Sequence, residues 1–67
     1  MELLINGDKL KLPNEIRTVS DLLEHFKLNQ KVVIVEVNGS ILEKGDHQES
    51  RLSDGDKIEI VHFVGGG

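Results

Sequence analysis

Only one segment of this 67-residue chain has the apolar spacing that is typical of an amphipathic helix, and this limits the folds open to it. Within residues 18–28, apolar side chains recur at i, i+3, i+4 and i+7, namely at Val19, Leu22, Leu23 and Phe26. Thr18 is a natural N-cap, Asp21 completes a capping box, and Asn29 is the expected stop. One helix can cover one face of a sheet, so the sequence predicts an α+β domain with one main helix on one face.

Strand-like segments and tight-turn signals flank this helix. Residues 3–12 predict a hairpin around Asn6-Gly7, a dipeptide that supplies the positive φ angles of a two-residue turn. Residues 32–37 are almost continuously β-branched and predict a central strand that is buried on much of both faces. Asn38-Gly39 is a second turn signal, and residues 41–42 form the short return strand.

The C-terminal part predicts a polar loop and one long strand. Residues 43–50 form the loop, which Leu52 anchors to the core, and Asp54-Gly55 turns the chain into a strand over residues 57–64. We expect this last strand in the middle of a mixed sheet of about five strands, parallel to the first strand. The resulting order is that of the β-grasp (ubiquitin-like) fold, with a domain over residues 1–64 and a flexible tail over residues 65–67.

Composition excludes several classes of function. The chain has no cysteine, which excludes a disulfide framework and a cysteine-based zinc site. Its net charge of −4 argues against nucleic-acid binding and favours a partner with a basic surface. No apolar run has the length of a membrane span, and the N-terminus does not resemble a signal peptide, so we expect a cytoplasmic protein. We also expect the protein to be monomeric when it is free of its partners.

No arrangement of side chains in the sequence indicates catalysis. The histidines, His25, His47 and His62, lack the spacing of metal ligands, and we expect them at the surface or at the boundary of the core. No carboxylate pair and no nucleophile–base pair can be assigned. The chain is therefore expected to bind no metal or cofactor and to have no catalytic residue of its own.

The outer face of the last strand is the first candidate site. If Ile58 and Ile60 face the core, then Val61 and Phe63 point the other way, next to the tail. An exposed apolar pair of this kind predicts a docking surface for a partner. The alternative is that the strand twists and that Phe63 packs at the edge of the core.

The glycine tail is the second candidate site. Gly65, Gly66 and Gly67 have no Cβ and adopt many backbone conformations, so this segment could enter a narrow channel in another protein. The α-carboxylate of Gly67 could then attack the α-phosphate of ATP in the partner's active site and form an acyl-adenylate. The alternative is an ordinary frayed terminus.

Three blocks resemble the ThiS family of sulfur carrier proteins of thiamine biosynthesis: residues 18–23, residues 35–39 and residues 54–67. The resemblance implies that an E1-like adenylating enzyme (ThiF-like) uses ATP to activate the Gly67 carboxylate. It also implies that sulfur from a cysteine desulfurase converts Gly67 to a thiocarboxylate, which a thiazole synthase (ThiG-like) uses to build the thiazole ring. The chain would then be a protein co-substrate, and its partners would use the ATP and the sulfur donor.

Three other functions fit the same residues. The small subunit of molybdopterin synthase has a similar fold and the same terminal chemistry. A ubiquitin-like modifier that is joined to lysines needs the same acyl-adenylate. The third is a β-grasp interaction module whose tail takes part in no reaction. Deletion of Gly67 distinguishes this module from the other functions, because only they need the terminal carboxylate.

Overall fold

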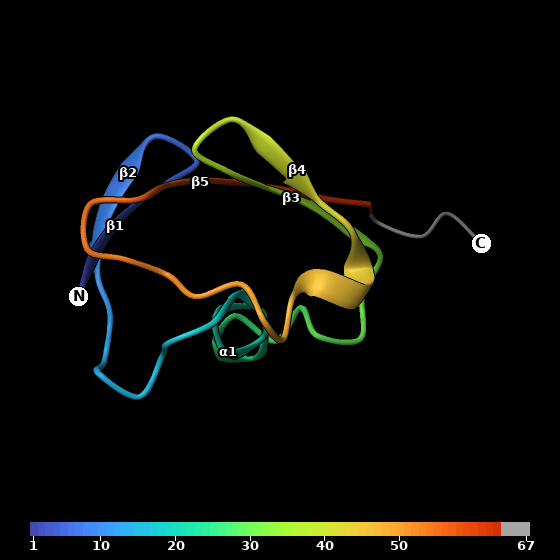
Figure 1. The fold of residues 1–67 in the computed structure, drawn as a ribbon, viewed down its shortest axis with the longest axis horizontal. Helices are drawn as coiled ribbons and strands as arrows, with labels where there is room; N and C mark the ends of the chain where they lie inside the picture. The colour runs from blue at the N-terminus through green and yellow to red at the C-terminus, as the bar shows by residue number, and fades with distance from the viewer. Residues whose placement is uncertain (64–67) are drawn as a thin grey trace.

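The predicted order of two strands, one helix and three further strands is confirmed by a computed structural model, which describes residues 1–63 (Figure 1). The strands are β1 (Glu2–Ile5), β2 (Asp8–Lys11), β3 (Val33–Val37), β4 (Ser40–Leu42) and β5 (Lys57–His62). The helix α1 spans Val19–His25, and a short 3₁₀ helix, η1, spans Lys44–Asp46 within the predicted loop.

The strand β5 lies in the middle of a five-stranded sheet of order β2-β1-β5-β3-β4. It runs parallel to β1, with Ile5 opposite Ile58, and antiparallel to β3, with Val37 also opposite Ile58. Both predictions for the last strand, its central position and its direction, are confirmed. The strand is shorter than expected, since it ends at His62 rather than at residue 64.

The predicted start of α1 is confirmed, and the predicted stop is wrong. Thr18 Oγ1 accepts a hydrogen bond from the Asp21 amide at 3.1 Å, and Asp21 Oδ2 accepts one from the Thr18 amide at 3.1 Å. The helix ends before Asn29, because Lys27 adopts a positive φ of 60°. The Lys27 amide then bonds to the Glu24 carbonyl and the Leu28 amide to the Leu23 carbonyl, which is a Schellman motif. Among residues 1–63, no helix is long and apolar enough to span a membrane.

The core lies between α1 and one face of the sheet. In Figure 1 the helix lies on one side of the sheet, and no described element covers the other side. The helix contributes Val19, Leu22 and Leu23, and the central strand contributes Ile58, which is fully buried. The remaining buried apolar residues come from β1, from the segment between β2 and α1, from β3 and from the segment between η1 and β5. They are Leu3, Ile5, Leu12, Ile16, Val35 and Leu52.

Two predictions of burial are wrong. The predicted strand over residues 32–37 was expected to be buried on much of both faces, but Val32, which precedes β3, is 72% exposed and Ile34 on β3 is 41% exposed. Only Val35 is fully buried. Phe26, the last residue of the apolar stripe, is 37% exposed because it caps the end of α1. The only α-helix within residues 1–63 lies on one side of the sheet, so the outward side chains of β3 have no layer above them.

The segment that contains η1 is tied to the start of α1. The His47 carbonyl accepts a hydrogen bond from the Ser20 amide at 3.0 Å, and the Arg17 carbonyl accepts one from the Leu52 amide at 2.8 Å. The predicted anchoring by Leu52 is confirmed, since this side chain is buried. His25 and His62 are exposed as expected, but His47 is 6% exposed and lies inside the core boundary. Its Nε2 atom is buried without a hydrogen-bond partner.

Candidate functional site

The candidate site is the end of β5 together with the outer face of the sheet. The predicted tail, Gly65, Gly66 and Gly67, lies outside the described residues, as does the predicted domain boundary at residue 64. The described chain ends at Phe63, whose amide donates a hydrogen bond to the Val32 carbonyl at 3.1 Å. The structure therefore defines the base from which the tail continues.

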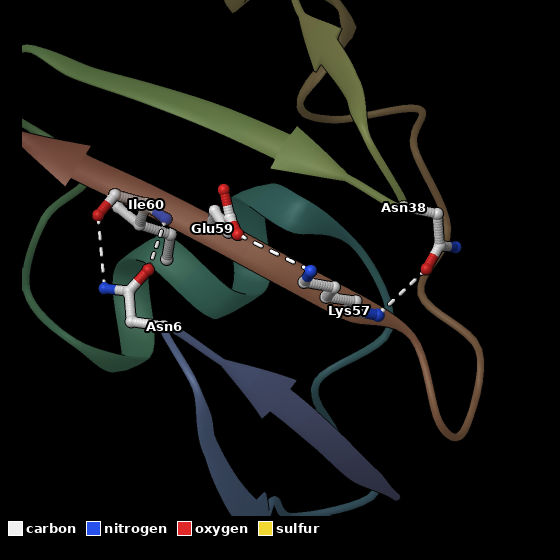
Figure 2. Close-up of polar contacts among 5 residues, drawn as sticks. All are labelled: Asn6, Asn38, Lys57, Glu59 and Ile60. Atoms are coloured by element: carbon white, nitrogen blue, oxygen red, sulfur yellow. Dashed lines mark hydrogen bonds and ion pairs between the residues drawn. The ribbon is translucent and has the colours of Figure 1, made fainter.

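Asn6 fixes one side of β5 beyond the end of β1. Its backbone amide donates to the Ile58 carbonyl at 2.9 Å. Its side chain then takes the place of a further strand residue, because Oδ1 accepts from the Ile60 amide at 2.8 Å and Nδ2 donates to the Ile60 carbonyl at 3.2 Å. Figure 2 shows this pair of bonds, which Asn6 makes from the start of the β1–β2 turn. One asparagine side chain thus extends the pairing of the central strand towards its C-terminal end.

Asn38 fixes the opposite side of β5 at its start. Its Oδ1 accepts from the Lys57 amide at 2.9 Å, as Figure 2 shows, and its Nδ2 donates to Asp56 Oδ1 at 3.0 Å. Asn6 and Asn38 have φ angles of 49° and 51°, and each is followed by a glycine with a φ of 87°. Both predicted Asn-Gly turns are confirmed. Sequence reasoning missed that both asparagine side chains also hold β5 in place.

The outer face of the sheet exposes more apolar side chains than the last strand alone suggested. Val61 and Phe63 are 53% and 50% exposed, so Phe63 is not packed into the core. Ile34 lies opposite Val61, and Ile41 on β4 lies opposite Glu36, which is also on this face. We call the five exposed side chains the outer apolar face; they are Val32, Ile34, Ile41, Val61 and Phe63. The contribution of β3 and β4 to it was missed because β3 was expected to be buried on both sides.

Two carboxylates face each other within this surface. Glu36 on β3 and Glu59 on β5 are directly opposite in the antiparallel ladder. A hydrogen bond to Glu59 raises the pKa of Glu36, and burial and the repulsion between the two carboxylates raise it further, whereas Lys57 lowers it. Lys57 Nζ lies 3.8 Å from Glu59 Oε1 (Figure 2), but both side chains are exposed, so this pair contributes little to stability.

The described residues provide no metal site. Within residues 1–63, no group of three or more histidine or acidic side chains is placed to hold a metal ion.

Comparison with known proteins gives one consistent result. The sequence model of the ThiS family matches residues 2–67. The sulfur carrier protein ThiS of Bacillus subtilis is 48% identical over 65 residues, which cover 97% of this chain and 98% of that protein. A crystal structure of the thiamine biosynthesis protein ThiS from Geobacter metallireducens is 35% identical, covers the whole of both chains and superposes with a TM-score of 0.83.

One relative differs in size. A protein from Paramagnetospirillum magneticum named thiazole synthase is 39% identical over 67 residues, which is all of this chain and 20% of that protein. A segment similar to this chain thus forms part of a much longer polypeptide there.

Proposed function

The chain belongs to the ThiS family, and we propose that it is a sulfur carrier protein of thiamine biosynthesis. The observation that carries this proposal is the identity of 48% to the sulfur carrier of Bacillus subtilis over nearly the full length of both proteins. The family match extends through the glycines at residues 65–67. In this role the chain is a co-substrate, and turnover belongs to its partners.

The reacting group in this proposal is the α-carboxylate of Gly67. A carboxylate oxygen attacks the α-phosphate of ATP in the site of an E1-like adenylating enzyme, which releases pyrophosphate and leaves a glycyl adenylate. The terminal sulfur of a persulfide, which a cysteine desulfurase supplies, then displaces AMP and forms an acyl disulfide with Gly67. A thiol attacks the other sulfur of this S–S bond, which releases the thiocarboxylate on Gly67 and leaves the two thiol groups joined as a disulfide. Gly65 and Gly66 have no side chain that could obstruct a narrow channel, which suits delivery of Gly67 into another protein.

The globular body contributes by positioning this end of the chain. Binding energy from a docked surface converts the reaction of a chain end into an effectively intramolecular step. The outer apolar face suits that role because it lies at the base of the tail and is not covered by any element within residues 1–63. Val61 and Phe63, which are next to the tail, are the docking residues that we propose to test first.

A thiazole synthase is the proposed recipient of the sulfur. In the Paramagnetospirillum relative, a segment similar to this whole chain forms one fifth of a protein named thiazole synthase. Two activities that share one polypeptide are held at high effective concentration, which is useful when one supplies the other. This arrangement supports a direct transfer from the thiocarboxylate to a separate thiazole synthase in the present case.

Mass spectrometry of the intact protein, purified from its host, tests the proposal. We expect a fraction of the protein to carry one sulfur in place of one oxygen, located on Gly67. Deletion of Gly67 should abolish ATP-dependent adenylation without changing the thermal midpoint. Gly67→Ala, which retains the carboxylate but adds a Cβ, should be adenylated more slowly than the wild type.

Other outcomes would contradict the proposal. Thiazole formation that survives deletion of Gly67 refutes the carrier function. Conjugates to lysine side chains, in the absence of a thiocarboxylate, indicate a protein modifier instead. A Phe63→Ala variant with lower stability but unchanged affinity for the adenylating enzyme removes Phe63 from the docking surface.

A further inference from the structure

Each of the two Asn-Gly turns contains the two groups that react when an asparagine spontaneously loses ammonia. In this reaction the backbone nitrogen of the next residue attacks the asparagine Cγ atom, and a following glycine favours the attack because it has no Cβ. The pairs are Asn6-Gly7 and Asn38-Gly39, and all four residues are exposed. Within residues 1–63, the Gly39 amide donates no hydrogen bond to the backbone, so its nitrogen is free to act as a nucleophile.

The fold restrains the two asparagine side chains by contacts of different kinds. Both side-chain bonds of Asn6 go to the backbone of Ile60, which lies inside β5. Asn38 Oδ1 accepts from the amide of Lys57, the first residue of β5 (Figure 2), and Nδ2 donates to the side chain of Asp56. The end of a strand and a side chain are released by smaller local openings than the inside of a strand. Asn38 is therefore the less restrained of the two.

We propose that Asn38 is a site of spontaneous deamidation and that its product weakens the attachment of β5. The Gly39 nitrogen loses its proton and bonds to Asn38 Cγ, and the bond from Cγ to Nδ2 breaks as ammonia leaves. This step closes a succinimide ring. Water then opens the ring at either of its two carbonyl groups, which leaves an aspartyl or an isoaspartyl residue at position 38. Water is the only co-reactant.

The product replaces an attractive contact by a repulsive one. Asn38 Nδ2 lies 3.0 Å from Asp56 Oδ1, and deamidation puts a carboxylate oxygen in place of this donor. Two carboxylates that share a site in this way repel each other. Asp56 Oδ2 also accepts a hydrogen bond from the Ser53 amide at 2.8 Å, which limits how far Asp56 can move away. In the isoaspartyl product the main chain is longer by one carbon, so the two-residue turn is lost as well.

Peptide mapping by mass spectrometry, during incubation of the full-length protein at neutral pH, measures the reaction at each asparagine. Asn14 and Asn29 are internal controls, because neither precedes a glycine. In the folded protein we expect Asn38 to react about fivefold faster than Asn6, which corresponds to one additional hydrogen bond of about 1 kcal/mol at Asn6. In concentrated urea, where the fold restrains neither side chain, the two rates should be nearly equal. A folded-state rate at Asn38 that does not exceed the rate at Asn6 overturns the proposed site.

Two substitutions test the effect on β5. Asn38→Asp has the side chain of the aspartyl product, and Asn14→Asp adds the same charge at another exposed position. We expect Asn38→Asp to lower the ratio of folded to unfolded protein by about tenfold in urea unfolding, because it loses a hydrogen bond and gains a repulsion. Asn14→Asp should stay near the wild-type value. Equal stability of the two variants overturns the proposed effect.

A double substitution tests the cause of this loss. Asn38→Asp combined with Asp56→Asn restores the net charge of −4 and puts the amide on the other side of the contact, so the hydrogen bond forms in the reverse direction. This variant should recover most of the lost stability, or recover folding if Asn38→Asp does not fold. A double variant that is no more stable than Asn38→Asp overturns the role of Asp56. None of these measurements involves adenylation, so their outcome is independent of the carrier function.

Discussion

Replacement of Asn6 tests how the central strand is held near the tail. The side chain of Asn6 makes two hydrogen bonds to the backbone of Ile60, at 2.8 Å and 3.2 Å, and no residue of β1 continues the ladder there. Asn6→Gly removes both bonds and keeps a residue that adopts a positive φ readily. Asn6→Ala removes the same bonds and also forces a Cβ into the left-handed region at φ 49°.

The expected losses follow from these two effects. A hydrogen bond contributes about 0.5–1.5 kcal/mol net, and the bonds of Asn6 are exposed, so Asn6→Gly should lower the free energy of unfolding by about 1–2 kcal/mol. Asn6→Ala should cost roughly 1 kcal/mol more, because an L-residue other than glycine or asparagine is strained at this φ. In a domain of this size, each kcal/mol corresponds to a shift of about 4–8 °C in the thermal midpoint.

Urea unfolding and amide hydrogen exchange measure these losses. Asn29→Gly is the matched control, since Asn29 is exposed and does not have a positive φ. We expect the Ile60 amide to exchange faster in both Asn6 variants and to be unchanged in the control. The reasoning is refuted if Asn6→Gly is as stable as Asn29→Gly and if the Ile60 amide keeps its protection.

Three further substitutions test the helix, the core and the buried histidine. Hydrogen bonds from the Arg17 and Thr18 amides lower the pKa of Asp21, so its ionised form stabilises the folded state. The advantage of the wild type over Asp21→Asn in urea unfolding should therefore be complete above about pH 4 and should vanish as the pH falls through the lowered pKa. Leu22→Ala, at a fully buried position, should cost roughly 2–5 kcal/mol and leave little folded protein by circular dichroism. His47→Leu removes a buried nitrogen that has no partner, so its urea midpoint should equal or exceed that of the wild type.

Local signals predicted the turns and the start of α1 correctly. The capping box depends on two side chains three residues apart, and each Asn-Gly turn depends on two adjacent residues, so nothing distant is needed to form them. The end of α1 could not be predicted in the same way. Lys27 has no special preference for the left-handed conformation that it adopts. Its conformation depends on the Schellman hydrogen bonds and on Leu28, which packs against the core.

Burial of β3 on both faces was predicted from its run of β-branched residues, and it required a second covering layer, which residues 1–63 do not supply. A continuous run of β-branched residues is typical of a strand that is covered on both sides. The only α-helix within residues 1–63 covers one side of the sheet, so the outward residues Val32 and Ile34 remain exposed. The observation that the sequence contains one helical segment already implied this result. For the same reason, the apolar character of Val61 and Phe63 was a better guide to an exposed surface than the run on β3.

The position of β5 connects the fold to the proposed function. The last strand could have joined the sheet at an edge, where one side of its backbone would be unpaired. It lies instead between β1 and β3, and the side chains of Asn6 and Asn38 add hydrogen bonds at its two ends. A chain end that must reach the active site of another protein is positioned best when its base belongs to the part of the fold that opens least often. The crossover that places β5 beside β1 therefore gives the tail a fixed point of origin, and the outer apolar face gives the same strand a surface with which to dock.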